Sequence, residues 1–383
     1  MGFLSLFLLA SMPIAQVLLI GLLGAYLASG YSNILTSSAR EDINKVVYTV
    51  FTPTLMFASL SQTVTLRDII SWWFMPVNVG LIFLIGSMLG QIVVRLLKIE
   101  THLQGLVIAA CSAGNLGNLL LIIIPAICSE AGSPFGDQSV CSANGLSYVS
   151  FSMALGGLYM WTYTYGIMKK ARRLQLKLQT DNNGGDNADN IDEAAVLTST
   201  RPIEESTESE LVCCSFRLNL KPPYFFVHQI LGFIFGTVPW LRSLVVGEEA
   251  PLRVVQDSIK LLGNGTIPCI TLILGGNLSK GLRKSTLKPL MIIAVICVRY
   301  MVLPVIGIGV VKLANELGYL PEDPLYHFVL MIQFTMPPAM NISTMAQLLH
   351  SGQDECSVVL LWSYLVAALA LTVWSMIFMW ILS

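Results

Sequence analysis

Charged residues are scarce in this chain. Asp, Glu, Lys and Arg make up 12% of its 383 residues, whereas soluble domains contain about 25%. Hydrophobic residues make up 54% of the chain. This combination predicts an integral membrane protein whose main surroundings are the lipid bilayer. The net charge of −1 gives no indication of binding to nucleic acid.

Motifs for catalysis and for metal binding are also missing. The sequence contains no HExxH or GxSxG motif and no paired intramembrane aspartates, so we expect no enzyme. The eight cysteines form no metal-binding motif, so we expect no cofactor. Cys128 and Cys141 flank one predicted non-cytosolic loop, and the sequence is compatible with a disulfide there or with two free thiols.

Apolar stretches recur at the length of roughly 20 residues that a membrane-spanning helix needs. The ten predicted spans are 6–30, 43–62, 72–97, 103–128, 143–170, 222–246, 254–278, 287–312, 324–350 and 356–382. Between the fifth and sixth, residues 181–210 carry nine acidic residues and one arginine, which predicts a disordered linker. The chain therefore divides into a first membrane unit (1–170), a linker (171–220) and a second membrane unit (221–383).

The distribution of Lys and Arg predicts the orientation, since these residues favour the cytosolic side of a membrane. With the N-terminus outside the cytosol, sixteen of them fall on the cytosolic side and four on the opposite side. This predicts a cytosolic linker and two non-cytosolic termini.

The two membrane units repeat each other. The five span starts before the linker recur after it at offsets of 211 to 221 residues, and "FTPTLMFASLS" resembles "TIPCITLILGG", with Pro53 opposite Pro268. Because five is an odd number, the second unit enters the membrane from the opposite side. Such inverted repeats are typical of secondary transporters.

Spans four and nine both contain helix-weakening residues near their middle, in "SAGNLGNLLLIIIP" and "FTMPPAMNIST". A broken helix exposes N–H groups and a partial positive charge, and two such ends facing each other suit an anion. Asparagine amides add donors at a lower cost than a buried Lys or Arg. The alternative is that Gly, Pro and Asn here serve packing alone. The predicted substrate-binding residues are Asn115, Gly117, Asn118, Pro337, Pro338 and Asn341.

Three charged residues within predicted spans are candidates for a coupling or structural role. Asp257 and Lys260 lie three residues apart, so they face the interior as a pair or lie near the membrane surface. Arg299 lies in the middle of span eight, where an unpaired arginine is costly, so we expect it to cap carbonyl groups or to line a cavity.

The segments "INKVVYTVFTPTLMFASLSQ", "NLGNLLLIIIPAICSE", "RYMVLPVIG" and "FTMPPAMNIST" resemble the auxin efflux carrier superfamily, and the plant PIN-LIKES group most closely. The resemblance implies an all-α fold of ten transmembrane helices in two inverted five-helix repeats, similar to bile-acid symporters. Helices four and nine would be broken and would cross, with the substrate carboxylate beside the crossing. Helices one, two, six and seven would form a scaffold and the others a moving unit.

The resemblance also implies the function: a carrier of auxin, indole-3-acetic acid, in the endoplasmic reticulum membrane, contributing to auxin homeostasis and signalling. Two positions depart from the pattern. The family's N-L-P-N falls on residues 115–118, where glycine (Gly117) replaces the proline. The charged pair early in helix three of the PIN carriers is absent from "SWWFMPVNVG", which offers only Asn78.

Other functions remain open at this point. A Na⁺- or H⁺-coupled symporter of organic anions belongs to the same class, and a membrane receptor or sensor for such an anion belongs to another. Uptake into vesicles separates a carrier, which accumulates or exchanges its ligand, from a receptor. Assembly into a homodimer is compatible with each of these functions.

Overall fold

The computed structural model describes residues 3–63, 66–129, 133–182, 224–247, 250–284 and 288–382. Within these residues the chain is α-helical throughout, apart from an isolated β-bridge. The helices before residue 183 are α1 (Phe3–Leu27), α2 (Ser37–Val46), α3 (Thr52–Thr63), α4 (Leu66–Ser71), α5 (Phe74–Leu97), α6 (Thr101–Ser112), α7 (Asn118–Ser129), α8 (Gln138–Tyr159) and α9 (Tyr165–Asn182). The helices after residue 223 are α10 (Tyr224–Thr237), α11 (Pro239–Val245), α12 (Arg253–Asn264), α13 (Thr266–Lys284), α14 (Pro289–Cys297), α15 (Leu303–Glu316), α16 (Pro324–Ile332), α17 (Asn341–Leu348) and α18 (Gln353–Leu382).

Short helical turns of other types connect several of these helices. The π-helical turns η1 (Val47–Phe51), η2 (Met160–Thr164) and η6 (Val298–Val302) join α2 to α3, α8 to α9 and α14 to α15. The 3₁₀ turn η7 (Gln333–Thr335) follows α16. A π-helical turn widens the helix locally, which redirects the side chains that it carries.

Several helices are suited to a bilayer. In the described part of the chain, four helical stretches are long and apolar enough to cross a membrane: Phe74–Leu97, Arg253–Asn277, Pro289–Glu316 and Gln353–Leu382. Ala15–Leu27 and Leu119–Ser129 are apolar but shorter. Predicted spans four and nine fall short of the required length because each is divided near its middle. The prediction of an integral, all-helical membrane protein is confirmed.

The two divisions occur where the sequence contains Gly and Pro. After α6 the backbone at Ala113 becomes extended, with φ −86° and ψ 106°, and α7 begins only at residue 118. After η7, Met336 is extended with φ −64° and ψ 141°. Met336 precedes Pro337, and a proline disfavours the helical conformation of the residue before it. The breaks thus span residues 113–117 and 336–340.

The two breaks pair with each other through their backbones. Asn115 N–H donates to the Pro337 carbonyl at 2.8 Å, and Ala339 N–H donates to the Ala113 carbonyl at 2.9 Å. Between these bonds, Gly114 and Pro338 face each other as an isolated antiparallel bridge. Residues in this non-hydrogen-bonded position donate nothing to their partner, so Pro338 loses nothing by lacking an N–H.

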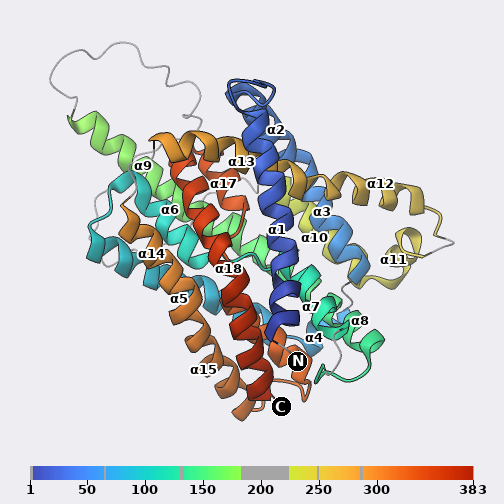
Figure 1. The fold of residues 1–383 in the computed structure, drawn as a ribbon. Helices are drawn as coiled ribbons and strands as arrows, with labels where there is room; N and C mark the ends of the chain where they lie inside the picture. Colours follow the sequence, from blue (N-terminus) through green and yellow to red (C-terminus); the bar gives the residue numbers. More distant parts are fainter. Residues whose placement is uncertain are drawn as a thin grey trace.

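Figure 1 shows both termini at one end of the molecule, while α2 and the far end of α9 lie toward the opposite end. Helix α3 packs against α10 and α12, and α1 packs against α13. Helix α18 contacts both α1 and α13. Helix α6 packs against α5 and α9, and α7 packs against α8.

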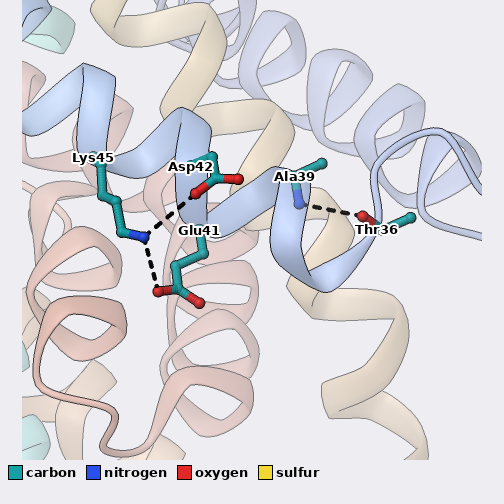
Figure 2. Close-up of polar contacts among 5 residues, drawn as sticks. All are labelled: Thr36, Ala39, Glu41, Asp42 and Lys45. Atoms are coloured by element: carbon teal, nitrogen blue, oxygen red, sulfur yellow. Dashed lines mark hydrogen bonds and ion pairs between the residues drawn. The ribbon is translucent and has the colours of Figure 1, made fainter.

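Helix α2 begins and ends with polar contacts (Figure 2). The Thr36 hydroxyl accepts a hydrogen bond from Ala39 N–H at 3.2 Å, which caps the start of the helix. In its last turn, the Lys45 ammonium lies 3.2 Å from a Glu41 carboxylate oxygen and 3.3 Å from one of Asp42. These exposed charges contribute little stability, and they mark this end of the molecule as polar.

A disulfide joins the end of α7 to the beginning of α8. It connects Cys128 with Cys141, whose Cα atoms lie 5.7 Å apart. Close by, the Asp137 carboxylate caps α8 by accepting from the backbone N–H groups of Ser139 at 2.9 Å and Val140 at 3.2 Å. A hydrogen bond from the Ser139 hydroxyl and these two backbone bonds lower the pKa of Asp137. The pairing that the sequence left open is therefore present.

Candidate functional site

A pocket lies at the crossing of the two helix breaks. The space between its walls is about 570 Å³ when the adjoining open solvent is included. One wall comes from α3 and α13, and the rest of the lining comes from both breaks, α8, η2 and the first residue of α17. The lining residues are Thr52, Leu55, Met56, Gly114, Asn115, Leu116, Gly117, Met153, Gly156, Gly157, Met160, Thr266, Ile267, Ile270, Ala339, Met340 and Asn341. None of these residues is charged.

Asn115 lies in the first break and is almost fully buried. Its side-chain amide donates to the Tyr364 hydroxyl on α18 at 2.9 Å, and its backbone N–H is used in the bridge to Pro337. Both interactions fix the orientation of the amide. Asn115 therefore presents a rigid polar surface to the pocket, and its donors are largely committed to the protein.

Asn341 lies on the opposite side of the crossing as the first residue of α17, and it is only partly buried. Among the described residues, its side chain has no hydrogen-bond partner, and its backbone N–H donates to no backbone carbonyl. The N-terminus of a helix carries a partial positive charge. Asn341 therefore supplies the pocket with uncommitted donors for an anionic group.

Two threonines line the wall formed by α3 and α13. Thr52 begins α3 and directly precedes Pro53, and Thr266 begins α13 two residues before Pro268. Both threonines are buried. The Thr266 hydroxyl oxygen has no hydrogen-bond partner in the described part of the chain. A buried polar atom without a partner is costly, so this hydroxyl is available to a ligand or to water.

Methionines form much of the apolar lining. Met56, Met153, Met160 and Met340 all border the pocket. Thioethers adapt to irregular shapes and make favourable contacts with aromatic rings. Gly117 is held tightly against this surface, because a Cβ atom added to it would lie 2.4 Å from Met153 Cγ. The pocket thus suits a flat apolar ligand that carries one polar end.

The other predicted site residues fall in three different places. Pro337 and Pro338 hold the bridge between the breaks and do not line the pocket. Asn118 is the first residue of α7, but its side chain lies outside the described residues. Asp257 and Lys260 are both exposed on α12, where Asp257 forms an exposed ion pair with Arg253 at 3.6 Å. They are not brought to the site, since the buried face of α12 is formed by other residues, among them Gln256.

Arg299 lies behind the crossing in η6 and is fully buried. Its guanidinium donates to the carbonyl of Cys111 at 3.2 Å and to that of Pro337 at 3.3 Å. The first carbonyl belongs to the last turn of α6, where helical carbonyls lack partners. Arg299 therefore connects both broken helices from behind the pocket.

A neutral polar network also supports the crossing. The Asn78 amide on α5 donates to the Gln333 side-chain oxygen at 2.8 Å. The Gln333 amide donates to the Ser152 hydroxyl at 2.9 Å, which donates to the Leu116 carbonyl at 3.3 Å. The network links the turn before the second break to the backbone of the first. Gln333 was visible in the sequence as an amide just before the Pro-Pro pair, but nothing there indicated Ser152 as its partner.

Comparison with known proteins agrees with this geometry. Residues 9–375 match the family described as "Membrane transport protein". The chain is 55% identical to PIN-LIKES 7 and 52% identical to PIN-LIKES 5 of Arabidopsis thaliana, and each alignment covers all of both chains. It is also 43% identical to PIN-LIKES 1 of the same plant, over all of this chain and 81% of that one. The resemblance seen in the sequence is confirmed, and members of this family are transporters and not enzymes.

The protein is membrane-embedded, has a pocket between two broken helices, and matches the family over almost its whole length. It is therefore a transporter of a small organic substrate. This chain therefore belongs to the membrane transport protein family, the family of the auxin efflux carriers, with the PIN-LIKES proteins among its full-length relatives.

Proposed function

We propose that the protein is a secondary transporter of an amphipathic aromatic organic anion, with indole-3-acetic acid as the leading candidate. The observation that carries the proposal is the pocket at the crossing, which combines an apolar, methionine-rich lining with uncommitted amide donors at the start of α17. Such a pocket provides for both parts of the ligand: the thioethers contact the ring, and the donors bind the carboxylate.

The proposed architecture consists of ten spans in two inverted five-helix repeats, formed by residues 1–170 and 221–383. Two paired features support it. The breaks at 113–117 and 336–340 occupy matching places and pair in antiparallel fashion. Thr52 and Thr266 begin helices of similar sequence, one from each unit, and both line the pocket. Inverted repeats place a binding site at their interface near the bilayer midplane.

In this proposal the substrate carboxylate binds beside Asn341. The backbone N–H and the side chain of this residue both donate, and the helix N-terminus adds its partial positive charge. Asn115, held by Tyr364, forms the opposite polar edge. Alternating access then requires the wall formed by α3 and α13 to shift relative to the crossing, so that the pocket opens to one side of the membrane at a time.

We further propose that residues 171–220 lie in the cytosol, that both termini are non-cytosolic, and that the protein resides in the endoplasmic reticulum membrane. The distribution of Lys and Arg supports the orientation. So does the position of both termini at the end of the molecule opposite to the charged helix α2 (Figure 1). The disulfide near Asp137 is suited to an oxidising lumen on the side of the termini.

The test is uptake of radiolabelled indole-3-acetic acid into liposomes that contain the purified protein. We expect uptake above that of empty liposomes, saturation with concentration, and competition by other aromatic acids. Binding at one ligand per protein without accumulation would instead identify a receptor. Uptake that requires an imposed Na⁺ or H⁺ gradient would identify a coupled symporter.

A further inference from the structure

Arg299 carries a positive charge into the interior of the membrane unit. Its side chain is fully buried within the π-helical turn η6. Two of its nitrogens donate to the carbonyls of Cys111 and Pro337, while its Nε atom has no partner in the described part of the chain. Carbonyl groups solvate a guanidinium, but they do not neutralise its charge.

No carboxylate compensates this charge within the described residues. The ion pairs there involve Lys45, His102 and Arg253, all of them partly or largely exposed, and none involves Arg299. The buried polar side chains in these ranges include neither Asp nor Glu. A buried charge without a counter-charge is strongly unfavourable, so its presence calls for a partner that arrives from outside.

The guanidinium lies directly behind the pocket. Gly114 lines the pocket, and a Cβ atom added to Gly114 would lie only 2.5 Å from Arg299 Nη2. Gly114 therefore borders both the ligand space and the guanidinium. Any larger residue at position 114 would push the guanidinium away from the crossing, which gives a physical reason for glycine at this position.

We propose that Arg299 is the fixed counter-charge for the carboxylate of the substrate. This inference rests on the proposed function and explains how the site selects a charged ligand. Arg299 acts as a positioning residue: it attracts one negative charge to the crossing through the poorly polarisable protein interior, and the amides at residue 341 make the direct contacts. The pocket then selects a monoanion over a neutral molecule of the same shape.

A purely structural role for Arg299 makes a different prediction. If the side chain only holds two carbonyls together, its replacement weakens the binding of every ligand of the pocket to the same degree. If it supplies the counter-charge, its replacement weakens the binding of the acid much more than the binding of a neutral analogue. The ratio of the two affinities therefore separates the two roles.

The experiment measures binding of indole-3-acetic acid and of its uncharged amide, indole-3-acetamide, to purified wild-type protein and three variants. Arg299→Gln removes the charge but retains an amide donor, Arg299→Lys retains the charge, and Gly114→Ala displaces the guanidinium without removing it. We expect Arg299→Gln to reduce the preference for the acid by roughly ten- to a hundredfold. Arg299→Lys should retain most of the preference, and Gly114→Ala should reduce it to an intermediate value.

An unchanged ratio of acid to amide affinity in folded Arg299→Gln, which means equal losses of affinity for both ligands, would overturn the inference. If Arg299→Gln does not fold, Gly114→Ala decides the question by the same criterion. If wild-type protein binds acid and amide equally well, the counter-charge is contradicted. If it binds neither, the proposed substrate is contradicted, and the same acid-to-amide ratio is measured with the acid that the uptake assay identifies, where the same criterion decides.

Discussion

Asn115 and Pro337 connect the two broken helices through a backbone hydrogen bond of 2.8 Å. The Pro337 carbonyl also accepts from Arg299 at 3.3 Å. One carbonyl thus holds the first break, the second break and a buried charge in a fixed relationship. The geometry of the pocket therefore depends on the second break remaining extended, and the two prolines are the residues that keep it so.

The first prediction concerns these prolines. Pro337→Ala alone leaves Pro338, which still disfavours a helical residue at 337, and Pro338→Ala alone leaves Pro337, which restricts Met336 in the same way. We expect each single variant to retain the break and most of the binding. The double variant allows α16 to continue, so that the carbonyl of residue 337 turns toward residue 341 and leaves Asn115. We expect acid binding more than about tenfold weaker.

Binding of radiolabelled acid to detergent-purified protein measures this effect, and hydrogen exchange at residues 113–117 reports whether the bridge is lost. The single variants serve as matched controls. A double variant that binds like wild type would show that the break does not shape the site.

The second prediction concerns Asn341. Asn341→Leu removes the side-chain donor at similar bulk, and a lost hydrogen bond to a charged group costs about 1.5–3 kcal/mol, roughly ten- to a hundredfold in affinity. Asn341→Asp should weaken binding at least as much, because like charges repel. Ser343→Ala in the same helix is the control, since Ser343 does not line the pocket. Equal titration curves for Asn341→Leu and Ser343→Ala would place the carboxylate elsewhere.

The third prediction concerns the contact between Gly117 and Met153. Gly117→Ala places a Cβ atom 2.4 Å from Met153 Cγ and 3.1 Å from Met153 Cβ. Such overpacking typically costs about 1–3 kcal/mol. We expect weaker binding and a lower melting temperature, and we expect Met153→Ala to relieve both when it is added. A double-mutant cycle over the two positions measures the coupling, and strictly additive effects would contradict the contact.

The fourth prediction concerns the disulfide. Cys128 and Cys141 are 13 residues apart, and closing a loop of about that size contributes roughly 3 kcal/mol to the free energy of unfolding. We expect Cys128→Ser to lower the melting temperature while leaving the pocket intact. Peptide mapping without reductant should recover the two cysteines in one linked species. Alkylation of both thiols in protein from native membranes would contradict the disulfide and its proposed lumenal location.

The sequence predicted the breaks and only part of the site. Gly and Pro in two otherwise apolar spans have few explanations other than an interruption, so residues 113–117 and 336–340 were predictable. Asn341 was predictable because an amide follows the Pro-Pro pair three residues later. The roles of the prolines were only partly foreseen, since the bridge that occupies the N–H groups of Asn115 and Ala339 forms between segments more than two hundred residues apart in the sequence.

Other contacts depended on packing that no local pattern reveals. The partnership of Asn115 with Tyr364 joins the first break to the last helix. Thr52 and Thr266 lie within matched motifs, but no sequence pattern indicates that both line the pocket. Asp257 and Lys260 fall within a predicted span. Their exposure follows from the amphipathic pattern of α12, in which Gln256 is buried.

A structure of the protein with bound indole-3-acetic acid tests the central claim most directly. The account predicts that the ring lies among Met56, Met153, Met160 and Met340. The carboxylate should lie within hydrogen-bond distance of the Asn341 amide, on the side of the pocket that Gly114 lines. Density for the acid at any other place, or with its carboxylate directed toward Thr52 and Thr266 and away from the crossing, would contradict it.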